Sequence, residues 1–528
     1  MKIKFKFFCA AIIVSGACCL LAFVQKNQNE KLLIKAEMEK SARKELIDVW
    51  YPKAVDKQYG GFLSTFSYDF KAVDPQDKMI VTQSRHVWSN AKAAVFYPSN
   101  PEFKVYAEHG FHFLRDVMWD KTNGGFYTLV SRNGTVKAGG FAAKEAYGNS
   151  FAIYALAAYY QASGDTSALN LAKKTFWWLE KHSHDPINKG YFQHLENNGM
   201  PVKRPANSKI NSEIGYKDQN SSIHLLESFT ELYNVWPDKL LRERLEEMFY
   251  LVRDKITTPK GNLVLFFKPD WTPISNRDSS EATIIKYSSI DHVSFGHDVE
   301  TAYLMLEASH FLGIHQDTLT LKKAKIMVDH ALNNGWDKSV GGFYDEGYYF
   351  KNKPEITIIR DSKNWWAQAE GLNTLLLMSE HFPNDQQQYY EKFKQLWKYI
   401  NTYLIDHEHG DWYQGGLDKQ PNYKTALKGQ IWKGTYHNFR ALMNCIQMLD
   451  PDLVSPTAPK NVKFIESKLT WTASTDNNNL IGYNIYQNGI KIGFTPLRSF
   501  RPEQPRNTSA FSVKAVDLHG NESKAAKY

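Results

Sequence analysis

Between residues 30 and 450 the chain alternates between two kinds of helical pattern. One kind is apolar on nearly all sides, as in residues 144–165. The other kind carries one polar face, as in residues 166–183, which follow directly. A helix that is apolar all round is enclosed by protein, whereas an amphipathic helix lies at the surface. The pattern therefore predicts repeated pairs of one inner and one outer helix.

A short turn signature separates these helix pairs. Aspartate, a few residues, glycine and an aromatic residue recur, as in "DKQYGGF" (residues 56–62) and "DKSVGGFY" (residues 337–344). Such residues indicate a tight turn that enters a short strand. The six copies are centred on Gly60, Gly124, Gly190, Gly261, Gly341 and Gly410. Six helix pairs at nearly even spacing can close into a ring, so a mainly α fold, an (α/α)6 barrel over residues 30–450, is expected.

The pattern changes after residue 450. Prolines at 451, 456 and 459 indicate a linker over residues 451–456. Residues 457–528 contain short alternating stretches separated by turn residues, which predict a small all-β sandwich. The positions of Trp471, Tyr483, Tyr486 and Phe511 and the final "AVDLHGNES" resemble a fibronectin type III module. Such a module is expected to act as a spacer or docking unit.

The first 28 residues have the composition of an export signal. A lysine-rich start precedes an apolar stretch from Phe7 to Val24, which is typical of a secretory signal or of a membrane or lipoprotein anchor. The small residues before Cys18 loosely resemble a lipoprotein cleavage site. We therefore expect an exported protein, periplasmic or at the cell surface. Cys445 is the single cysteine after this segment, so no internal disulfide is expected in the processed chain.

Composition narrows the class of partner. The formal net charge is +8, but lysine and arginine are spread along the chain, and no basic run with interleaved aromatics predicts a nucleic-acid partner. Aromatic residues make up 14% of the chain. They fit either a large core or a site where sugar rings stack on aromatic faces.

Polar residues gather where the inner helices begin. Burying one such group without a partner costs about 1–3 kcal/mol, so their placement at equivalent helix ends favours a common funnel over a core. Any one of these residues also has a plain structural interpretation, such as a salt bridge for Arg85 or core packing for Trp365. The candidates are Arg85, Tyr147, Asn220, His224, Glu227, His297, Glu300, Trp365, Trp366, Glu370, Trp432 and His437. The histidines lack the close pairing on one helix that is typical of zinc sites, so no metal is expected.

Three motifs together carry a family resemblance: "SFGHDVE" (residues 294–300), "NWWAQAE" (residues 364–370) and "WKGTYHN" (residues 432–438). With these motifs the chain resembles the N-acylglucosamine 2-epimerase superfamily, and within it the cellobiose 2-epimerases and their mannobiose 2-epimerase relatives. The resemblance implies that His297 and His437 exchange the C2 proton of a sugar. It further implies that His224 assists ring opening, that Arg85 lies near the reacting oxygens, and that Asn220, Glu300, Trp366 and Glu370 contact substrate.

The expected reaction interconverts the reducing-end glucose and mannose of a β-linked disaccharide. Ring opening, removal of the C2 proton and its return to the opposite face of a cis-enediolate need two proton-transfer groups, and histidine titrates in the right range. No cofactor is expected. Two alternatives stay open: a glycoside hydrolase with a carboxylate pair such as Glu300 and Glu370, and an N-acylglucosamine 2-epimerase or aldose–ketose isomerase. A non-catalytic glycan-binding protein is a further alternative. Tyr303 departs from the tryptophan typical of disaccharide epimerases.

Overall fold

The computed structural model describes residues 28–137, 142–503 and 511–528. The predicted signal or anchor, residues 1–28, lies outside the described residues except for its last position. Among the helices of the described ranges, none combines the length and the apolar character needed to cross a membrane.

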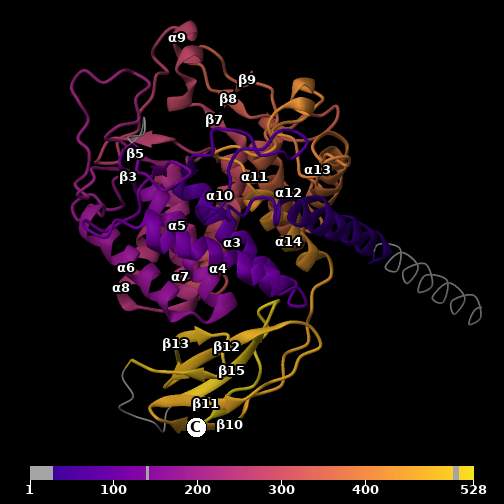
Figure 1. Ribbon diagram of the computed structural model, residues 1–528. Helices are drawn as coiled ribbons and strands as arrows, with labels where there is room; N and C mark the ends of the chain where they lie inside the picture. The colour runs from indigo at the N-terminus through magenta and orange to yellow at the C-terminus, as the bar shows by residue number, and fades with distance from the viewer. Residues whose placement is uncertain (1–27, 138–141, 504–510) are drawn as a thin grey trace, which may run out of the picture.

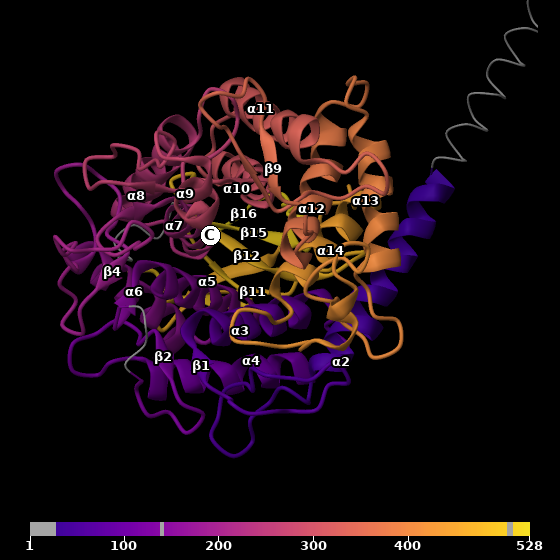
Figure 2. The same cartoon turned by 90° about the horizontal axis from the view of Figure 1, so that it is seen from above.

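Six inner helices form a closed ring. Each contacts the next one along the chain, and the last returns to contact the first. Figure 2 shows this ring from above, with strands of the C-terminal unit behind it. The inner helices are α3 (Ile80–Phe96), α5 (Ala146–Ser163), α7 (Gln219–Val235), α10 (Phe295–Phe311), α12 (Trp365–His381) and α14 (Tyr436–Leu449). The predicted helical barrel is confirmed.

The outer helices pack against the inner ones in sequence order. They are α4 (Glu102–Phe113), α6 (Thr166–His182), α8 (Lys239–Leu251), α11 (Thr318–Gly335) and α13 (Tyr389–Tyr403). Short π-helical segments, η2 (Leu114–Met118) and η3 (Val252–Ile256), extend α4 and α8. The sixth outer position is filled from the start of the chain, where residues 28–40, η1 (Ser41–Ile47) and α2 (Asp48–Trp50) pass beside α14. The two ends of the barrel sequence are thus joined.

Short antiparallel strands lie at one end of the barrel (Figure 1). A strand precedes each of the first four inner helices and pairs with a strand from the next repeat. The pairs are β1 (Lys78–Met79) with β2 (Leu129–Val130), β3 (Lys144–Glu145) with β4 (His194–Leu195), β5 (Lys217–Asp218) with β6 (Phe266–Phe267), and β7 (Val293–Ser294) with β8 (Glu346–Tyr348). Strand β8 also pairs with β9 (Thr357–Arg360). The remaining short helices are α9 (Glu281–Lys286), η4 (Ser288–Ile290) and η5 (Pro421–Thr425).

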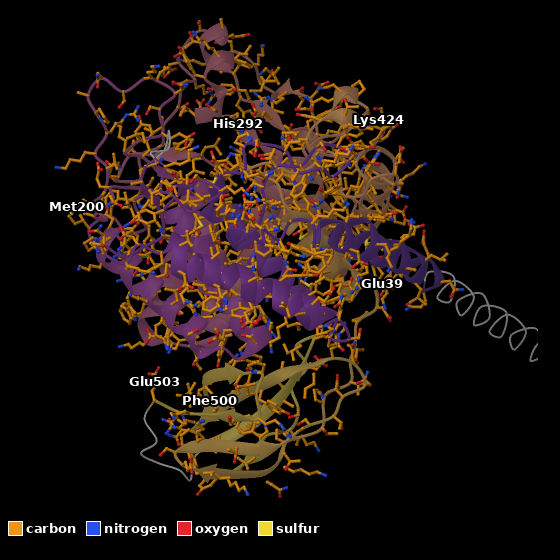
Figure 3. The ribbon with its side chains drawn as sticks, viewed as in Figure 1. Glu39, Met200, His292, Lys424, Phe500 and Glu503 are labelled. Carbon is orange, nitrogen blue, oxygen red and sulfur yellow. The ribbon has the colours of Figure 1, made fainter. Side chains whose placement is uncertain are left out.

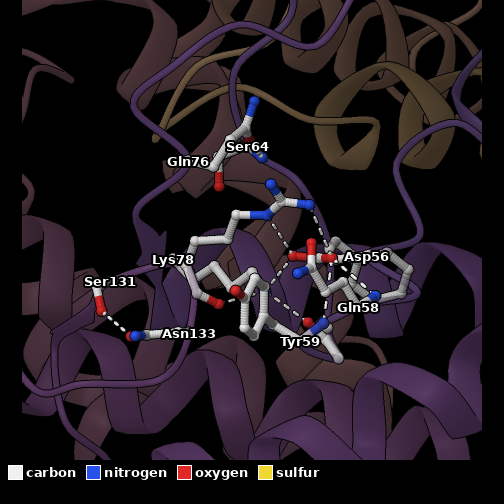
Figure 4. Close-up of polar contacts among 12 residues, drawn as sticks. Asp56, Gln58, Tyr59, Ser64, Gln76, Lys78, Ser131 and Asn133 are labelled. Atoms are coloured by element: carbon white, nitrogen blue, oxygen red, sulfur yellow. Dashed lines mark hydrogen bonds and ion pairs between the residues drawn. The ribbon is translucent and has the colours of Figure 1, made fainter.

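The repeated turns are each closed around a glycine with positive φ, as the signature predicted. In five of the six, a buried lysine reaches the aspartate of the turn. In the first, Lys78 Nζ donates to Asp56 Oδ2 at 2.9 Å and to the Gly60 carbonyl at 2.6 Å (Figure 4). The other pairs are Asp120–Lys144, Asp185–Lys217, Asp337–Lys363 and Asp406–Lys428. The fourth turn has Thr258 and Val293 at these positions, so both charges are missing together.

The C-terminal unit consists of two antiparallel sheets, which confirms the predicted small β domain. Helix α14 ends at Leu449 and the first strand begins at Lys460. One sheet has the order β10 (Lys460–Ile465), β11 (Lys468–Thr472) and β14 (Ser499–Phe500). The other has the order β13 (Ile490–Thr495), β12 (Leu480–Gln487), β15 (Phe511–Asp517) and β16 (Ala526–Lys527). A core that includes Trp471 and Tyr483 fills the space between them.

This β unit lies against the barrel end opposite to the short strands (Figure 1). Several of its hydrogen bonds reach the last turns of inner helices. Tyr160 Oη donates to the Phe494 carbonyl at 2.8 Å, and Gln447 Nε2 donates to the Leu518 carbonyl at 2.9 Å. The first turns of the same helices lie at the other end of the barrel, and the candidate site lies there.

Candidate active site

The predicted site residues lie in the first three turns of the inner helices or just before them. A cavity of about 240 Å³ opens at this end, lined among others by Tyr147, Asn220, His297 and Trp432. His292 also lines it, and Figure 3 shows that residue at the barrel end away from Phe500 of the β unit. The helix starts therefore converge on one funnel, because each inner helix enters the ring with the same polarity.

Two histidines from different helices lie against one indole ring. The ring of Trp366, in α12, is 4.7 Å from the ring of His297, in α10, and 6.0 Å from the ring of His437, in α14. Each histidine is held through Nδ1: His297 by Ser294 Oγ at 2.9 Å, and His437 by Glu370 Oε1 at 2.7 Å. Fixing Nδ1 orients the ring and leaves Nε2 as the nitrogen for proton transfer.

Burial keeps both imidazoles neutral. It lowers the pKa of His297 to about 3. It also lowers the pKa of His437 well below its usual value, and the positive charges of Arg85 and Arg440 act in the same direction. At neutral pH each ring is therefore a base with an available lone pair, which proton abstraction from carbon requires.

Arg440 is a central residue that the sequence analysis missed. Its guanidinium is 2% exposed and pairs with three carboxylates, bonding Glu227 through Nη1 and Glu300 and Glu370 through Nη2, the latter two at 2.8 Å. Its sequence signal was an arginine in the middle of the apolar helix "YHNFRALM", three residues after His437. One turn of α14 thus carries both His437, the candidate base, and Arg440, whose charge holds Glu370, the carboxylate partner of His437.

The cluster has one more negative group than positive groups. Glu227, Glu300 and Glu370 face the guanidiniums of Arg440 and Arg85. Burial and the neighbouring Glu370 raise the pKa of Glu300 to about 7. Burial opposes ionisation of Glu227 as well, but Arg440 and His224 more than offset it and lower its pKa to about 2. Near neutral pH the cluster can therefore hold one exchangeable proton beside the histidines.

His224 and Arg85 lie beside this cluster. His224 Nδ1 bonds Glu227 Oε2 at 2.9 Å, so Glu227 orients the imidazole. Arg85 donates to the Tyr147 hydroxyl and to the Trp432 carbonyl, both at 3.2 Å. The Tyr147 and His224 rings are 5.3 Å apart. These groups connect the cavity wall to the buried carboxylates.

Two residues of the three family motifs, Trp365 and Lys433, have surroundings different from those of the histidines. Trp365 is 8% exposed and packs in the barrel core, 5.7 Å from the Lys433 ammonium. Lys433 pairs with buried Asp411, and Lys144 pairs with Asp120 in the second turn. The lysines near the helix starts therefore stabilise the turns, whereas the histidines, Arg85 and Trp366 build the site.

The carboxylate pair has the wrong surroundings for glycoside hydrolysis. Glu300 and Glu370 both bond the same nitrogen of Arg440, and both are at most 1% exposed. A hydrolytic acid and base must lie on either side of a sugar linkage, with room for water or for a covalent intermediate. Together with His437 these groups also form a cluster that could hold a metal ion, but both carboxylates already bond the guanidinium.

Arg440 gives a stability prediction. Arg440→Met strands three buried carboxylates without their shared cation, so we expect the free energy of unfolding to fall by about 3–5 kcal/mol in urea denaturation at pH 7. Arg277→Met is the control, because Arg277 is exposed in the loop before α9; its effect should stay within about 0.5 kcal/mol. Equal stability of the two variants would show that Arg440 does not stabilise the three carboxylates.

Comparison with known proteins places this site in a family. The chain matches the N-acylglucosamine 2-epimerase (GlcNAc 2-epimerase) family over residues 60–441. It is 28% identical to a cellobiose 2-epimerase of Bacteroides fragilis over 429 residues, which cover 79% of this chain and 99% of the relative. It is 29% identical to a cellobiose 2-epimerase of Ruminococcus albus over 410 residues, which cover 76% and 97%.

Solved structures agree with this assignment. The cellobiose 2-epimerase from Spirochaeta thermophila superposes with a TM-score of 0.66 at 26% identity, covering 80% of this chain and 98% of the other. The family match spans most of the helical ring and includes the motifs around His297, Trp366 and His437. The chain therefore belongs to the N-acylglucosamine 2-epimerase family and is an isomerase.

Proposed function

We propose that the protein epimerises C2 of the reducing-end sugar of a β-linked disaccharide, interconverting glucose and mannose. The observation that carries this proposal is the pair of neutral imidazoles, His297 and His437, held against one indole by different helices. A single proton-transfer group on one face could remove the C2 proton but would return it to the same face. Two groups on different helices, one for each face of C2, allow inversion.

The proton steps follow from the hydrogen bonds. With the aldehyde open, C1 acidifies the C2–H bond, and Nε2 of one histidine takes the proton to give an enediolate. If His437 is that base, Glu370 stabilises the imidazolium through Nδ1–H. The second histidine, here His297, takes a proton from solvent through the cavity that it lines and delivers it to the other face of C2. His437 afterwards passes its proton to Glu370 and on to solvent, so the protons balance over one turnover, and the reverse reaction exchanges the roles.

Arg85 and His224 serve the oxygens in this scheme. Arg85 stabilises the enediolate oxyanion, and such a donor contributes about 2.7–4 kcal/mol to the transition state. His224, held by Glu227, exchanges the proton that ring opening requires. Trp366 stacks on the sugar, and Tyr147, Asn220 and Trp432 border the cavity through which it enters.

The disaccharide preference rests on the relatives. Both relatives compared above are named cellobiose 2-epimerase, and each is covered almost completely by this chain. An N-acylglucosamine 2-epimerase or an aldose–ketose isomerase could use the same enediolate. The alternatives differ in product: a ketose forms only if the proton returns to C1.

The test is a reaction in heavy water. Incubation with cellobiose should give the mannose-ended epimer, with deuterium at C2 of the reducing residue, as read by NMR and mass spectrometry. The disaccharide mass should otherwise be conserved. Product formed without solvent deuterium at C2 would rule out the two-base scheme, and free glucose would restore the hydrolase alternative.

We also infer that the chain is exported and that its β unit is a fibronectin type III-like module. Export is supported by the lysine-rich start and the apolar stretch that follows it. The module assignment is supported by the two antiparallel sheets around Trp471 and Tyr483. Fractionation of the native cells with an antibody to the barrel would test export.

A further inference from the structure

A second cavity lies at the seam between the barrel and the β unit. It measures about 440 Å³ and lies between α10, α12 and α14 on one side and the loop after β15 on the other. The barrel end that it occupies is opposite to the funnel. Its polar lining includes Tyr303, Asn373, Glu380, Asn444, Gln447 and His519.

Two of these side chains lack partners among the described residues. Asn373 is 1% exposed, yet neither its amide nitrogen nor its amide oxygen has a hydrogen-bond partner there. Both ring nitrogens of His519 are likewise buried without a partner in the described chain. Burying an amide without a hydrogen bond is unfavourable. A side chain at a cavity wall with both polar ends unpaired therefore indicates that a ligand in the cavity supplies the hydrogen bonds.

The lining selects the chemistry of that ligand. Of the described residues that line the cavity, none is a lysine or an arginine, and the two acidic side chains, Glu380 and Asp452, are acceptors. Amides, a phenol, an imidazole and carboxylates offer donors and acceptors in several directions, while Leu377 and Met448 offer apolar surface. Hydroxyl groups with an apolar C–H face match this mixture, whereas an anion would meet only acidic and neutral groups.

We propose that this seam cavity is a second binding site, for a neutral sugar, and that the β unit helps to form it. The β unit closes the cavity through two contacts: Gln447 Nε2 donates to the Leu518 carbonyl, and Asn521 Nδ2 donates to the Asp452 carbonyl at 2.8 Å. Removing the β unit would remove His519, Leu518 and Asn521 from the wall. The β unit thus supplies part of the wall of a binding site that the barrel cannot form alone.

The seam cavity also borders the catalytic cluster. Tyr303 lines the cavity, and its hydroxyl donates to Glu307 at 3.1 Å and accepts from Asn444 at 3.2 Å. The ring of Tyr303 lies 5.9 Å from the Arg440 guanidinium. A sugar in the seam cavity would therefore contact Tyr303. Tyr303 in turn contacts Arg440, which pairs with the carboxylates that hold His224 and His437.

The experiment measures binding without turnover. Cellobiitol, whose reducing end is an alditol, cannot be epimerised, so its binding does not depend on the proposed reaction. Ligand-observed NMR titrations would use the full chain carrying Trp366→Ala, which weakens the funnel. We expect cellobiitol to bind this protein, and we expect its affinity to fall at least tenfold when Asn373→Ala is added.

Asn401→Ala, on the exposed face of α13, is the matched control and should leave binding unchanged. His519→Leu, in the β unit, should reproduce the loss, so the result does not depend on Asn373→Ala folding well. Thermal melts and the cellobiose turnover of each seam variant with Trp366 intact report folding separately. The proposal is overturned if cellobiitol does not bind the Trp366→Ala protein, or if Asn373→Ala and His519→Leu both leave its affinity unchanged.

Discussion

His297→Asn and His437→Asn should each lower kcat for cellobiose epimerisation by about 10²–10⁴-fold, the range expected for losing one general acid–base group. Asparagine keeps a polar side chain of similar reach but cannot exchange a proton. Because the two histidines act on opposite faces, each single variant can retain deuterium exchange from one epimer while losing net conversion. Solvent exchange at C2, followed separately from glucose-ended and mannose-ended substrate, would assign a face to each histidine.

A third histidine supplies the matched control. His292 lines the same cavity, but its Nδ1 bonds the Ser288 carbonyl at 2.8 Å, and it belongs to the loop before β7. His292→Asn should change kcat less than about tenfold. If His292→Asn were as damaging as His297→Asn, or if either catalytic variant kept full net conversion, the histidine pair would not be the proton-transfer pair.

The sequence was sufficient to predict the ring because its signals are local. Residues 144–165 show an enclosed helix by composition alone, and the six turn glycines all adopt the positive φ that their positions implied. The first turns of the inner helices could be ranked as a site because polar groups there conflict with an apolar helix. These features need no knowledge of what lies across the ring.

The missed residues all depend on partners far away in the chain. Arg440 pairs with Glu227, which is 213 positions earlier, so no spacing rule connects them. Lys144 also lies at the start of an inner helix, but it closes the second turn through Asp120. A lysine at a helix start looks the same in either role. Only the fold decides whether its ammonium turns toward the cavity or back toward the preceding turn.

The five buried Asp–Lys pairs should be the main electrostatic determinant of barrel stability. In the third turn, Lys217 is fully buried and donates to Asp185 Oδ2 at 2.7 Å and to the carbonyls of Lys189 and Pro269. Lys217→Met removes the cation but leaves the carboxylate, so we expect the free energy of unfolding to fall by about 3–5 kcal/mol in urea denaturation. Asp185→Asn keeps an acceptor for the turn amides, yet it strands the ammonium and should cost a similar amount.

The fourth turn indicates what happens when both charges are absent. There Thr258 and Val293 occupy the two positions, and the turn still closes around Gly261 with positive φ. The double variant Asp185→Asn/Lys217→Met should therefore lose less stability than the sum of the two single variants, with a coupling free energy of about 0.5–3 kcal/mol. Strict additivity would mean that the lysine acts through its bonds to the two carbonyls alone. A clear coupling would explain why the charges are present or absent together, since one buried charge without the other is the costly state.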